Sequence, residues 1–278
     1  MQHVLQKIPH VIRFKLNNQK IISPSIHVHL EKGRYIVKTA DSFEEISQVL
    51  TLRHKVFYGE FSTKRFTTSL IPYDIDFYDF GCDHLIVKDK SSDTVIACYR
   101  LRADNSGKKI KRFYSEGEFK IDEFLNSLGG KLELGRACVH KDFRKGTVIS
   151  LLWSGVLEYA GKSGARFMFG CSSVVRSDFD QLASMLNWLQ DNDAFINNLN
   201  IDVHSKYKLT KEIKEIINST QQKTSSQKAI NSLIHMYILA GAKLSRNMAY
   251  DAEMDCIDFF TLIDLEAIPH SFKKKFAA

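Results

Sequence analysis

Proline, paired cysteines and long apolar runs are all scarce in this sequence of 278 residues, and each scarcity excludes a class of protein. The four prolines leave no Pro-rich linker between Pro72 and Pro269, which favours one continuous domain. The five cysteines are scattered without a CxxC pair, so neither a disulfide framework nor a zinc knuckle is expected. The closest approach to a membrane span, residues 147–160, contains Glu158 and is shorter than the roughly 18 apolar residues a span requires. The first 20 residues alternate apolar and basic side chains, unlike a signal peptide. We therefore expect a soluble, cytoplasmic protein.

Charge is present in both signs, with a modest basic excess. Lysine and arginine number 39 and aspartate and glutamate 32, which gives a formal net charge of +7. Such an excess suits an acidic partner or an anionic surface, but it is small for a dedicated nucleic-acid binder, and no recognition motif is present. Nucleic acid is therefore not an expected partner.

The pattern of apolar residues predicts alternating strands and helices without strict βαβ order. Ser42 and Glu45 form a capping box, which opens a helix that runs to about Phe57. Strands are expected at 34–39, 84–88, 94–102, 131–139, 166–171 and 256–265, and further helices at 121–128, 147–161, 179–190 and 227–240. Residues 218–228 form an expected exposed loop. This mixture predicts an α/β or α+β fold with a sheet covered by helices. Residues 1–33 are interpreted as an N-terminal extension and 34–278 as one domain.

The segment from 133 to 171 is the richest candidate for a site, because eight of the fourteen glycines fall between 129 and 170. A strand leads there into a short basic loop and then into a long helix. Backbone N–H groups of such a loop and of the helix N-terminus favour anions, and Lys141, Arg144 and Lys145 add positive charge. A purely structural turn with solvated lysines is the alternative.

Several motifs in register carry a resemblance to a known family. The order LRHKVFYGEF (52–61), DIDFYD (74–79), CDHLIV (82–87), ACYRL (97–101) and ELGR (133–136) resembles acyl-homoserine-lactone synthases. A fuller resemblance is to the ornithine N-acyltransferases of ornithine-lipid synthesis, within the GCN5-related N-acetyltransferase superfamily. It rests on the further segments ELGRACVHKDFR, LLWSGVLEY, FGCSS, YILAGAK (237–243) and DFFTLIDL (258–265). The likeness covers about residues 34–276.

The resemblance implies a fold and a reaction. The fold is the acetyltransferase one, a mixed, splayed sheet flanked by helices. The reaction moves a 3-hydroxyacyl group from acyl carrier protein to the α-amino group of ornithine, which gives lyso-ornithine lipid. The donor loop is Val139, His140, Arg144, Lys145 and Gly146, and Thr147 and Ile149 stand where the family loop has glycines that wrap the coenzyme A diphosphate. A phosphopantetheine arm has no diphosphate, so a carrier-protein thioester is the expected donor, with no bound cofactor.

Glu133 and Arg136 are the catalytic candidates. The amine must lose a proton, and Glu133, the glutamate of the family's ExxR motif, is expected to act as the base. A salt-bridged structural glutamate is the alternative. Strand alternation places Glu133 and Arg136 on opposite faces unless Gly135 allows a bulge, which would also turn N–H groups toward the thioester oxygen. Arg136 would then contribute positive charge to the site or bind a carboxylate. An alternative interpretation is that Arg136 forms a structural ion pair.

Arg53 lies on the apolar stripe of its helix, and a buried charge needs a partner. Asp76 and Asp79 are the expected partners, and the resemblance makes Arg53, Asp76, Asp79 and Arg100 the acceptor site. The same aspartates, with Asp74, are alternatively a site for the cationic side chain of ornithine. Calcium fits them poorly because the glycine and distal glutamate of an EF-hand loop are missing, so no metal is expected. Arg100 is as consistent with a structural role.

The remaining reactive side chains have weaker signals. Cys138 and Cys171 lie in strands among apolar neighbours, where thiols are usually inert packing. His84 and His140 are possible proton shuttles. Basic residues at 271–276, with Lys108, Lys109, Lys111 and Arg112, suit an acidic carrier protein or a peripheral contact with the inner membrane face; a solvated tail is the alternative.

Two other functions remain open at this point. The first is an acyl-homoserine-lactone or other N-acyl-amino-acid synthase, which differs in its acceptor. The second is an acyl-carrier-binding module without turnover.

Overall fold

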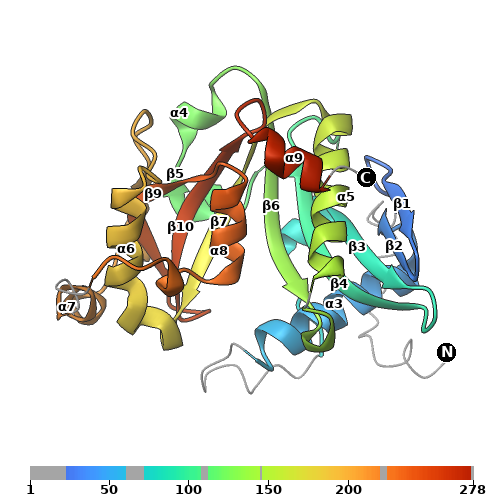
Figure 1. Ribbon diagram of the computed structural model, residues 1–278, viewed down its shortest axis with the longest axis horizontal. Helices are drawn as coiled ribbons and strands as arrows, with labels where there is room; N and C mark the ends of the chain where they lie inside the picture. The colour runs from blue at the N-terminus through green and yellow to red at the C-terminus, as the bar shows by residue number, and fades with distance from the viewer. Residues whose placement is uncertain (1–22, 61–71, 108–111, 145, 220–223, 277–278) are drawn as a thin grey trace. The chain divides into compact units, whose positions relative to one another are not determined.

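The computed structural model describes residues 23–60, 72–107, 112–144, 146–219 and 224–276, which divide into two compact units (Figure 1). The first unit comprises Met1–Lys111, Leu134–Gly164 and Phe276–Ala278, and the second comprises Arg112–Glu133 and Ala165–Lys275. Among the described residues, no helix has the length and hydropathy needed to cross a membrane.

The first unit is built on an antiparallel sheet. Its strands lie in the order β1 (His29–Lys32), β2 (Tyr35–Thr39), β3 (Asp83–Asp89) and β4 (Thr94–Ala103), followed by the second half of β6 (Gly130–Val139). The predicted strands at 34–39, 84–88, 94–102 and 131–139 are confirmed. β1 was not predicted; it lies in the segment interpreted as an N-terminal extension and pairs with β2. The same segment also contacts β3, because Asp83 accepts hydrogen bonds from the backbone N–H groups of Ser25 and Ile26.

Two helices cover opposite faces of this sheet. Helix α3 (Phe43–Phe57) packs on the face of the sheet that carries Ile86. Helix α5 (Thr147–Ser163) approaches Leu85. Because neighbouring residues of a strand point to opposite faces, α5 lies on the other face. The approach of α5 needs glycine, because a Cβ on Gly155 would lie 2.5 Å from Val37 Cγ1. The predicted cap of α3 is confirmed, since Ser42 Oγ accepts the N–H of Glu45. In the second half of the cap, the Glu45 carboxylate accepts the N–H of Asp41 rather than that of Ser42.

The main strands of the second unit combine parallel and antiparallel pairing. The first half of β6 pairs in parallel with β7 (Ala165–Val175) over Gly130–Glu133, β10 (Cys256–Asp264) pairs antiparallel with β7, and β9 (Lys243–Asp251) pairs antiparallel with β10. The strands at 166–171 and 256–265 are thus confirmed, and β9 is an additional strand. A mixed α/β fold, mostly antiparallel with one parallel pair and flanked by helices, is the predicted class.

Alternating residues of β10 face two different layers. Ile257 and Phe259 pack in a core with α6 (Leu182–Asp191), α7 (Lys211–Ser219) and α8 (Ser232–Leu239), whereas Phe260 packs in an aromatic core with Phe119 and Phe124. The aromatic core is covered by β5 (Phe119–Lys120), β8 (Asp202–Val203) and α4 (Asp122–Leu125). Helix α9 (His270–Phe276) is the last described element.

Several predicted helices differ in extent. The helix predicted at 121–128 is only α4, because Asn126 caps it and Gly129 takes a left-handed φ of 99°. The helix predicted at 179–190 is the 3-10 turn η4 (Arg176–Gln181) followed by α6, and that at 227–240 is η6 (Gln227–Ala229) followed by α8, which Asn231 caps. The predicted loop at 218–228 begins within α7, and residues 220–223 lie outside the described part of the chain.

Candidate active site

Six charged side chains from four segments meet in the first unit. Arg53 comes from α3, Arg100 from β4 and Arg136 from β6, and the three aspartates come from residues 74–79, around the 3-10 turn η1 (Phe77–Gly81). We call this group the arginine–aspartate cluster; its members are Arg53, Asp74, Asp76, Asp79, Arg100 and Arg136. Four of the motifs quoted above, at 52–61, 74–79, 97–101 and 133–136, each contain at least one member of this cluster.

Arg53 is the fully buried centre of the arginine–aspartate cluster. Its Nε lies 2.6 Å from Asp74 Oδ2 and its Nη1 lies 2.6 Å from Asp79 Oδ1. Burial alone disfavours the charged guanidinium, but the charges of Asp79 and Asp74 more than offset this and raise the pKa of Arg53 well above its ordinary value. Although burial opposes it, Arg53 and then Arg100 also hold the pKa of Asp79 far below the usual range. The ion pairs therefore stay charged at any physiological pH.

Asp76 is not a partner of Arg53, which corrects the sequence-based expectation. Its two carboxylate oxygens lie 2.7 Å from Arg100 Nη1, and Arg136 Nη2 lies 3.2 Å from its Oδ2. Asp76 also caps η1 by accepting the N–H groups of Tyr78 and Asp79, and this turn directs its carboxylate toward β4 and β6. Asp74 takes its place beside Arg53.

His84 lies against the same cluster, 3.8 Å from Asp79 Oδ1, and is 2% exposed. Burial lowers the pKa of His84 to about 4; the nearby Asp79 acts in the opposite sense, while Arg53 and Arg100 reinforce the lowering. The imidazole is therefore neutral at pH 7. A role as proton shuttle stays a prediction.

Arg136 and Asp76 are the more accessible members of the cluster, with 18% and 25% of their side chains exposed. The backbone of Arg136 has a φ of 49°, in the left-handed region. The irregularity predicted at Gly135 therefore falls one residue later, on the arginine itself. It is this change of direction that lets the Arg136 guanidinium reach Asp76.

Glu133 belongs to the second unit and has a different environment. It is 6% exposed, its Oε1 lies 2.7 Å from both the N–H nitrogen and the hydroxyl oxygen of Ser115, and its Oε2 lies 2.8 Å from the N–H nitrogen of Tyr114. Ser115 opens the 3-10 turn η2 (Ser115–Gly117). These donors fix the orientation of the carboxylate.

The predicted donor loop lies at the N-terminus of α5. Arg144 Nε lies 3.1 Å from the Val139 carbonyl oxygen, and its Nη2 forms a 2.6 Å ion pair with Glu60. His140 caps the short turn η3 (Lys141–Phe143), and Gly146 precedes α5 with a φ of 70°. Among the described residues, no side chain caps α5, and no acidic residue lies in its first turn, so the positive end of this helix favours an anion. Lys145 lies outside the described residues.

The cysteine candidates are poor nucleophiles. Cys138 Sγ lies 3.4 Å from Cys98 Sγ in the core of the first unit, and this contact together with burial raises the pKa of Cys138 well above its ordinary value. Burial, followed by the charge of Glu118, does the same for Cys171. Both thiols stay protonated at neutral pH.

Sequence reasoning missed one group of titratable side chains, in the second unit. Glu118, Asp251 and Asp258 are buried close together beside Cys256. Burial, followed by the charge of Asp258, raises the pKa of Glu118 far above its ordinary value. The only sequence signal was Asp-x4-Cys-x-Asp at 251–258, which becomes informative once a hairpin is assumed there.

Comparison with known proteins gives matches of two kinds. Residues 52–154 match the family model described as an acetyltransferase (GNAT) domain. Over 163 residues the chain is 34% identical to the L-ornithine N(alpha)-acyltransferase of Rhizobium meliloti, a match that covers 56% of this chain and 55% of that protein. Proteins of the same name from Brucella abortus and Rhodobacter capsulatus are each 26% identical, over 88% and 86% of this chain and 90% and 93% of their own lengths. The chain thus matches about half the length of the Rhizobium protein and nearly the whole of the other two.

Proposed function

Because this chain is a relative of the L-ornithine N(alpha)-acyltransferases and contains a GNAT-type domain, we propose that it is an N-acyltransferase that acts on ornithine. It moves a 3-hydroxyacyl group from acyl carrier protein to the α-amino group of ornithine and so makes lyso-ornithine lipid. The observation that carries the proposal is the likeness to ornithine acyltransferases over 88% and 86% of the chain.

The acceptor binds, in this proposal, at the accessible side of the arginine–aspartate cluster. Arg136 offers a guanidinium for the carboxylate of the amino acid, and Asp76 offers a carboxylate for an ammonium group. Arg53, Asp79 and Arg100 are buried and already paired, so their role is to hold Asp76 and Arg136 in place. The aspartates of the cluster have little charge left for ornithine's side chain, because three arginines balance them.

Glu133 is the proposed base. The α-ammonium loses one proton to the base before the nitrogen attacks the thioester carbon. As the C–S bond breaks, the nitrogen loses a second proton, and the thiolate takes up a proton and leaves as the thiol of the carrier arm. A carboxylate oriented by fixed donors is suited to accept the proton directly or through water. The left-handed turn at Arg136 supports the proposal that nearby backbone N–H groups stabilise the oxyanion.

The donor arm binds at the loop before α5. The uncapped N-terminus of α5 and Arg144 favour the single phosphate of phosphopantetheine, with Val139, His140, Lys145 and Gly146 forming the rest of the loop. Arg144 is held between the Val139 carbonyl and Glu60, so the phosphate would compete with Glu60 for its guanidinium.

An acidic carrier protein would find exposed lysines on α9. Lys273, Lys274 and Lys275 are exposed on this helix, whereas Phe272 and Phe276 are buried and anchor it. The predicted patch at 271–276 is therefore an anchored helix and not a solvated tail. Lys108, Lys109 and Lys111 lie outside the described residues. Contact with a carrier protein or with an anionic membrane would weaken as salt increases.

The proposal is tested with the lipid extract of a host that makes no ornithine lipid and with the purified protein. Expression should give a new 3-hydroxyacyl-ornithine mass, and the protein should form the same product from 3-hydroxyacyl carrier protein and L-ornithine. Glu133→Ala and Arg136→Gln should abolish or greatly reduce it. Arg246→Gln, which alters an exposed arginine bound to Gln190 and Asn197, should not.

Other results would change the proposal in defined ways. A different N-acylated amine would keep the chemistry and replace the acceptor, as for an N-acyl-amino-acid or homoserine-lactone synthase. Turnover with acyl-coenzyme A alone would replace the donor. Binding of carrier protein without any product from folded protein would favour the binding-module alternative.

A further inference from the structure

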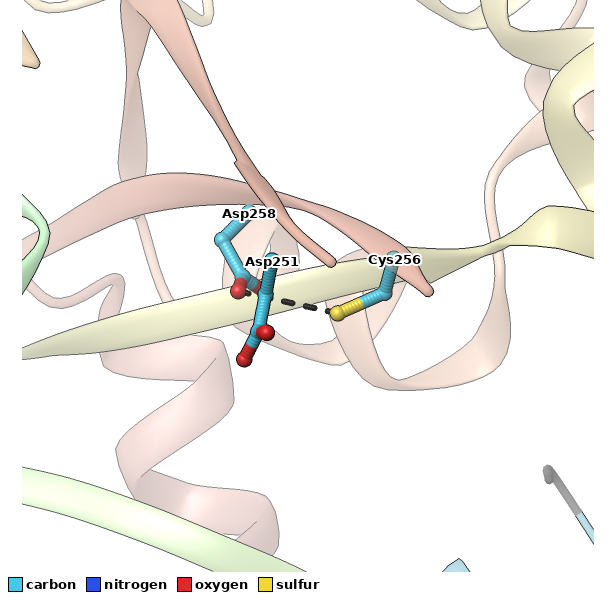
Figure 2. Close-up of side chains that lie close together, drawn as sticks. All are labelled: Asp251, Cys256 and Asp258. Atoms are coloured by element: carbon cyan, nitrogen blue, oxygen red, sulfur yellow. Dashed lines mark hydrogen bonds between the residues drawn. The ribbon is translucent and has the colours of Figure 1, made fainter. Parts of the chain in front are cut away.

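One face of the β9–β10 hairpin carries three potential metal ligands, and the strand register places them together. Asp251 on β9 lies directly opposite Cys256 on β10, and Asp258 follows two residues later on the same face of β10 (Figure 2). This face also carries Phe260, which packs in the aromatic core of the second unit. The three polar side chains therefore point into the protein beneath the layer that contains β5 and β8.

The ligand atoms of these three side chains are close enough to share one ion. One carboxylate oxygen of Asp251, one of Asp258 and Cys256 Sγ all lie within 4.8 Å of one another, and Cys256 Sγ lies 3.6 Å from Asp258 Oδ2. Neutral donors hold the carboxylates: Asp251 Oδ1 accepts the N–H groups of Glu253 and Met254, and Asp258 Oδ1 accepts the Ser173 hydroxyl. One oxygen of each aspartate is thus oriented by these donors. The second oxygen of Asp258 accepts the Cys256 thiol proton, which metal binding would remove.

Glu118 is a fourth potential ligand, and it comes from a different part of the second unit, the layer that covers this face of the hairpin. It directly precedes β5, it is 1% exposed, and among the described residues none donates a hydrogen bond to its buried Oε1. Its Oε2 lies 3.6 Å from Cys171 Sγ. Glu118 forms a hydrogen bond with Asp258 and also interacts electrostatically with Asp251, so its carboxyl group faces the hairpin ligands.

The charge of this group is not balanced by nearby cations. In the described part of the chain, no lysine, arginine or histidine forms an ion pair with Glu118, Asp251 or Asp258. Lys206 interacts electrostatically with Asp251, but its ammonium lies over the Tyr207 ring. Burying several carboxylates without a counter-charge is expensive unless they are protonated or bind a cation.

We propose that Asp251, Cys256, Asp258 and Glu118 bind one divalent metal ion of the zinc type. Zinc takes thiolate sulfur at about 2.3 Å and carboxylate oxygen at about 2.0–2.2 Å in tetrahedral sites. The three hairpin ligand atoms, which lie within 4.8 Å of one another, suit such an ion. Calcium is disfavoured, because it requires six or more oxygen ligands and does not favour sulfur. Binding converts the Cys256 thiol to a thiolate and releases its proton to solvent. The ion would join the β9–β10 hairpin to the segment that leads into β5.

Metal content of the full-length wild-type protein is the first test. The protein is stripped with EDTA, dialysed against zinc and then against metal-free buffer, and analysed by inductively coupled plasma mass spectrometry. One equivalent of zinc per chain is expected. Cobalt in place of zinc should give the near-ultraviolet thiolate-to-cobalt band of a tetrahedral site. Protein that retains no zinc above a parallel zinc-free sample, or cobalt without a thiolate band, would overturn the proposal.

Matched variants locate the ion. Asp258→Asn and Cys256→Ser should each weaken zinc binding at least tenfold, and Glu118→Gln should do so as well. Asp255→Asn is the matched carboxylate control: it lies in the same hairpin, and its φ of 49° suits asparagine. Cys138→Ser is the thiol control. If both controls lose zinc as strongly as the ligand variants, the ion binds elsewhere and the proposal is wrong.

A rise in the melting temperature with added zinc is expected from wild-type protein and should be absent in Asp258→Asn. An alternative cation is the ammonium group of an amino acid. If L-ornithine raises the melting temperature through Asp258 while zinc does not, the group binds an organic cation and the metal proposal fails. These readouts do not depend on acyl transfer, so they stand apart from the test of the proposed function.

Discussion

The two units bury charge in opposite ways. The arginine–aspartate cluster of the first unit places three guanidiniums against three carboxylates, with Arg53 fully buried and bonded to two of them. The acidic group of the second unit places Glu118, Asp251 and Asp258 together, and the described part of the chain supplies them with hydroxyl, thiol and backbone N–H donors but with no ion pair. The charges of the first group balance one another. The negative charge of the second group is balanced only if its carboxylates are protonated or bind a cation.

This difference indicates what each group is for. A complete ion-pair network resists change and holds its exposed members, Asp76 and Arg136, in fixed positions. An incomplete group costs stability unless something binds, which is the usual mark of a ligand site. Substitutions in each group should therefore affect stability to different extents.

Removing one carboxylate charge from each group should have unequal effects. Asp79→Asn leaves Arg53 and Arg100 buried with too little negative charge, so the free energy of unfolding should fall by about 3–5 kcal/mol. In metal-free protein, Asp258→Asn relieves repulsion and should change it by less than about 1 kcal/mol. Urea denaturation in EDTA at pH 7 measures both. Equal losses in the two variants would remove the contrast between the groups.

His84 should make the first unit sensitive to mild acid. Its pKa is lowered to about 4 in the folded protein, so the unfolded state binds a proton at higher pH than the folded state does. Stability is therefore present above about pH 6.5 and is lost as pH falls toward 4, by up to about 3 kcal/mol. His84→Phe should flatten the decline between pH 7 and pH 4 in denaturation curves.

His29→Phe, which replaces an exposed histidine, is the control and should leave that slope unchanged. An unchanged slope in His84→Phe would instead show that the carboxylates of the cluster cause the decline.

Glu133 is a third case, a buried carboxylate that accepts hydrogen bonds from the neutral donors of Tyr114 and Ser115. Glu133→Gln turns an NH₂ group toward an N–H of Tyr114 or Ser115, so we expect a loss of about 1–3 kcal/mol in the free energy of unfolding. The exposed Glu123→Gln should cost under about 0.5 kcal/mol. If Glu133 is the base, product formation measured well below the melting temperature should fall much further than the folded fraction; a parallel fall would indicate a structural role.

Arg136 should matter little for stability and much for activity. Arg136→Gly removes partly exposed ion pairs but also relieves the left-handed backbone, and these effects should cancel to within about 1 kcal/mol. Product formation should fall at least tenfold, mainly through KM for the amino acid. A large loss of stability with normal kinetics would place Arg136 with the buried, structural members of the cluster.

Local patterns predicted much of the fold because they depend on near neighbours. The Ser42 cap, the long hairpin of β3 and β4 and the helix at 147–161 follow from spacing within a few residues. The 3-10 turn η4, the short α4 and strand β9 were missed or misplaced, since their polar sequences become ordered only by packing against distant elements.

The sequence predicted the class of fold, the likeness to ornithine acyltransferases and an acceptor site of Arg53, Asp76, Asp79 and Arg100. It assigned Arg136 to a catalytic pair with Glu133, and the fold adds this arginine to the cluster. The pairing of Arg53 with Asp74 and not with Asp76 depends on the fold, because the 3-10 turn at Phe77–Gly81 sets the direction of each carboxylate. The fold alone joined Glu118 to a hairpin more than 130 residues later in the chain. Such contacts depend on strand register and on which layer covers a sheet face, and neither is encoded in the spacing of neighbouring residues.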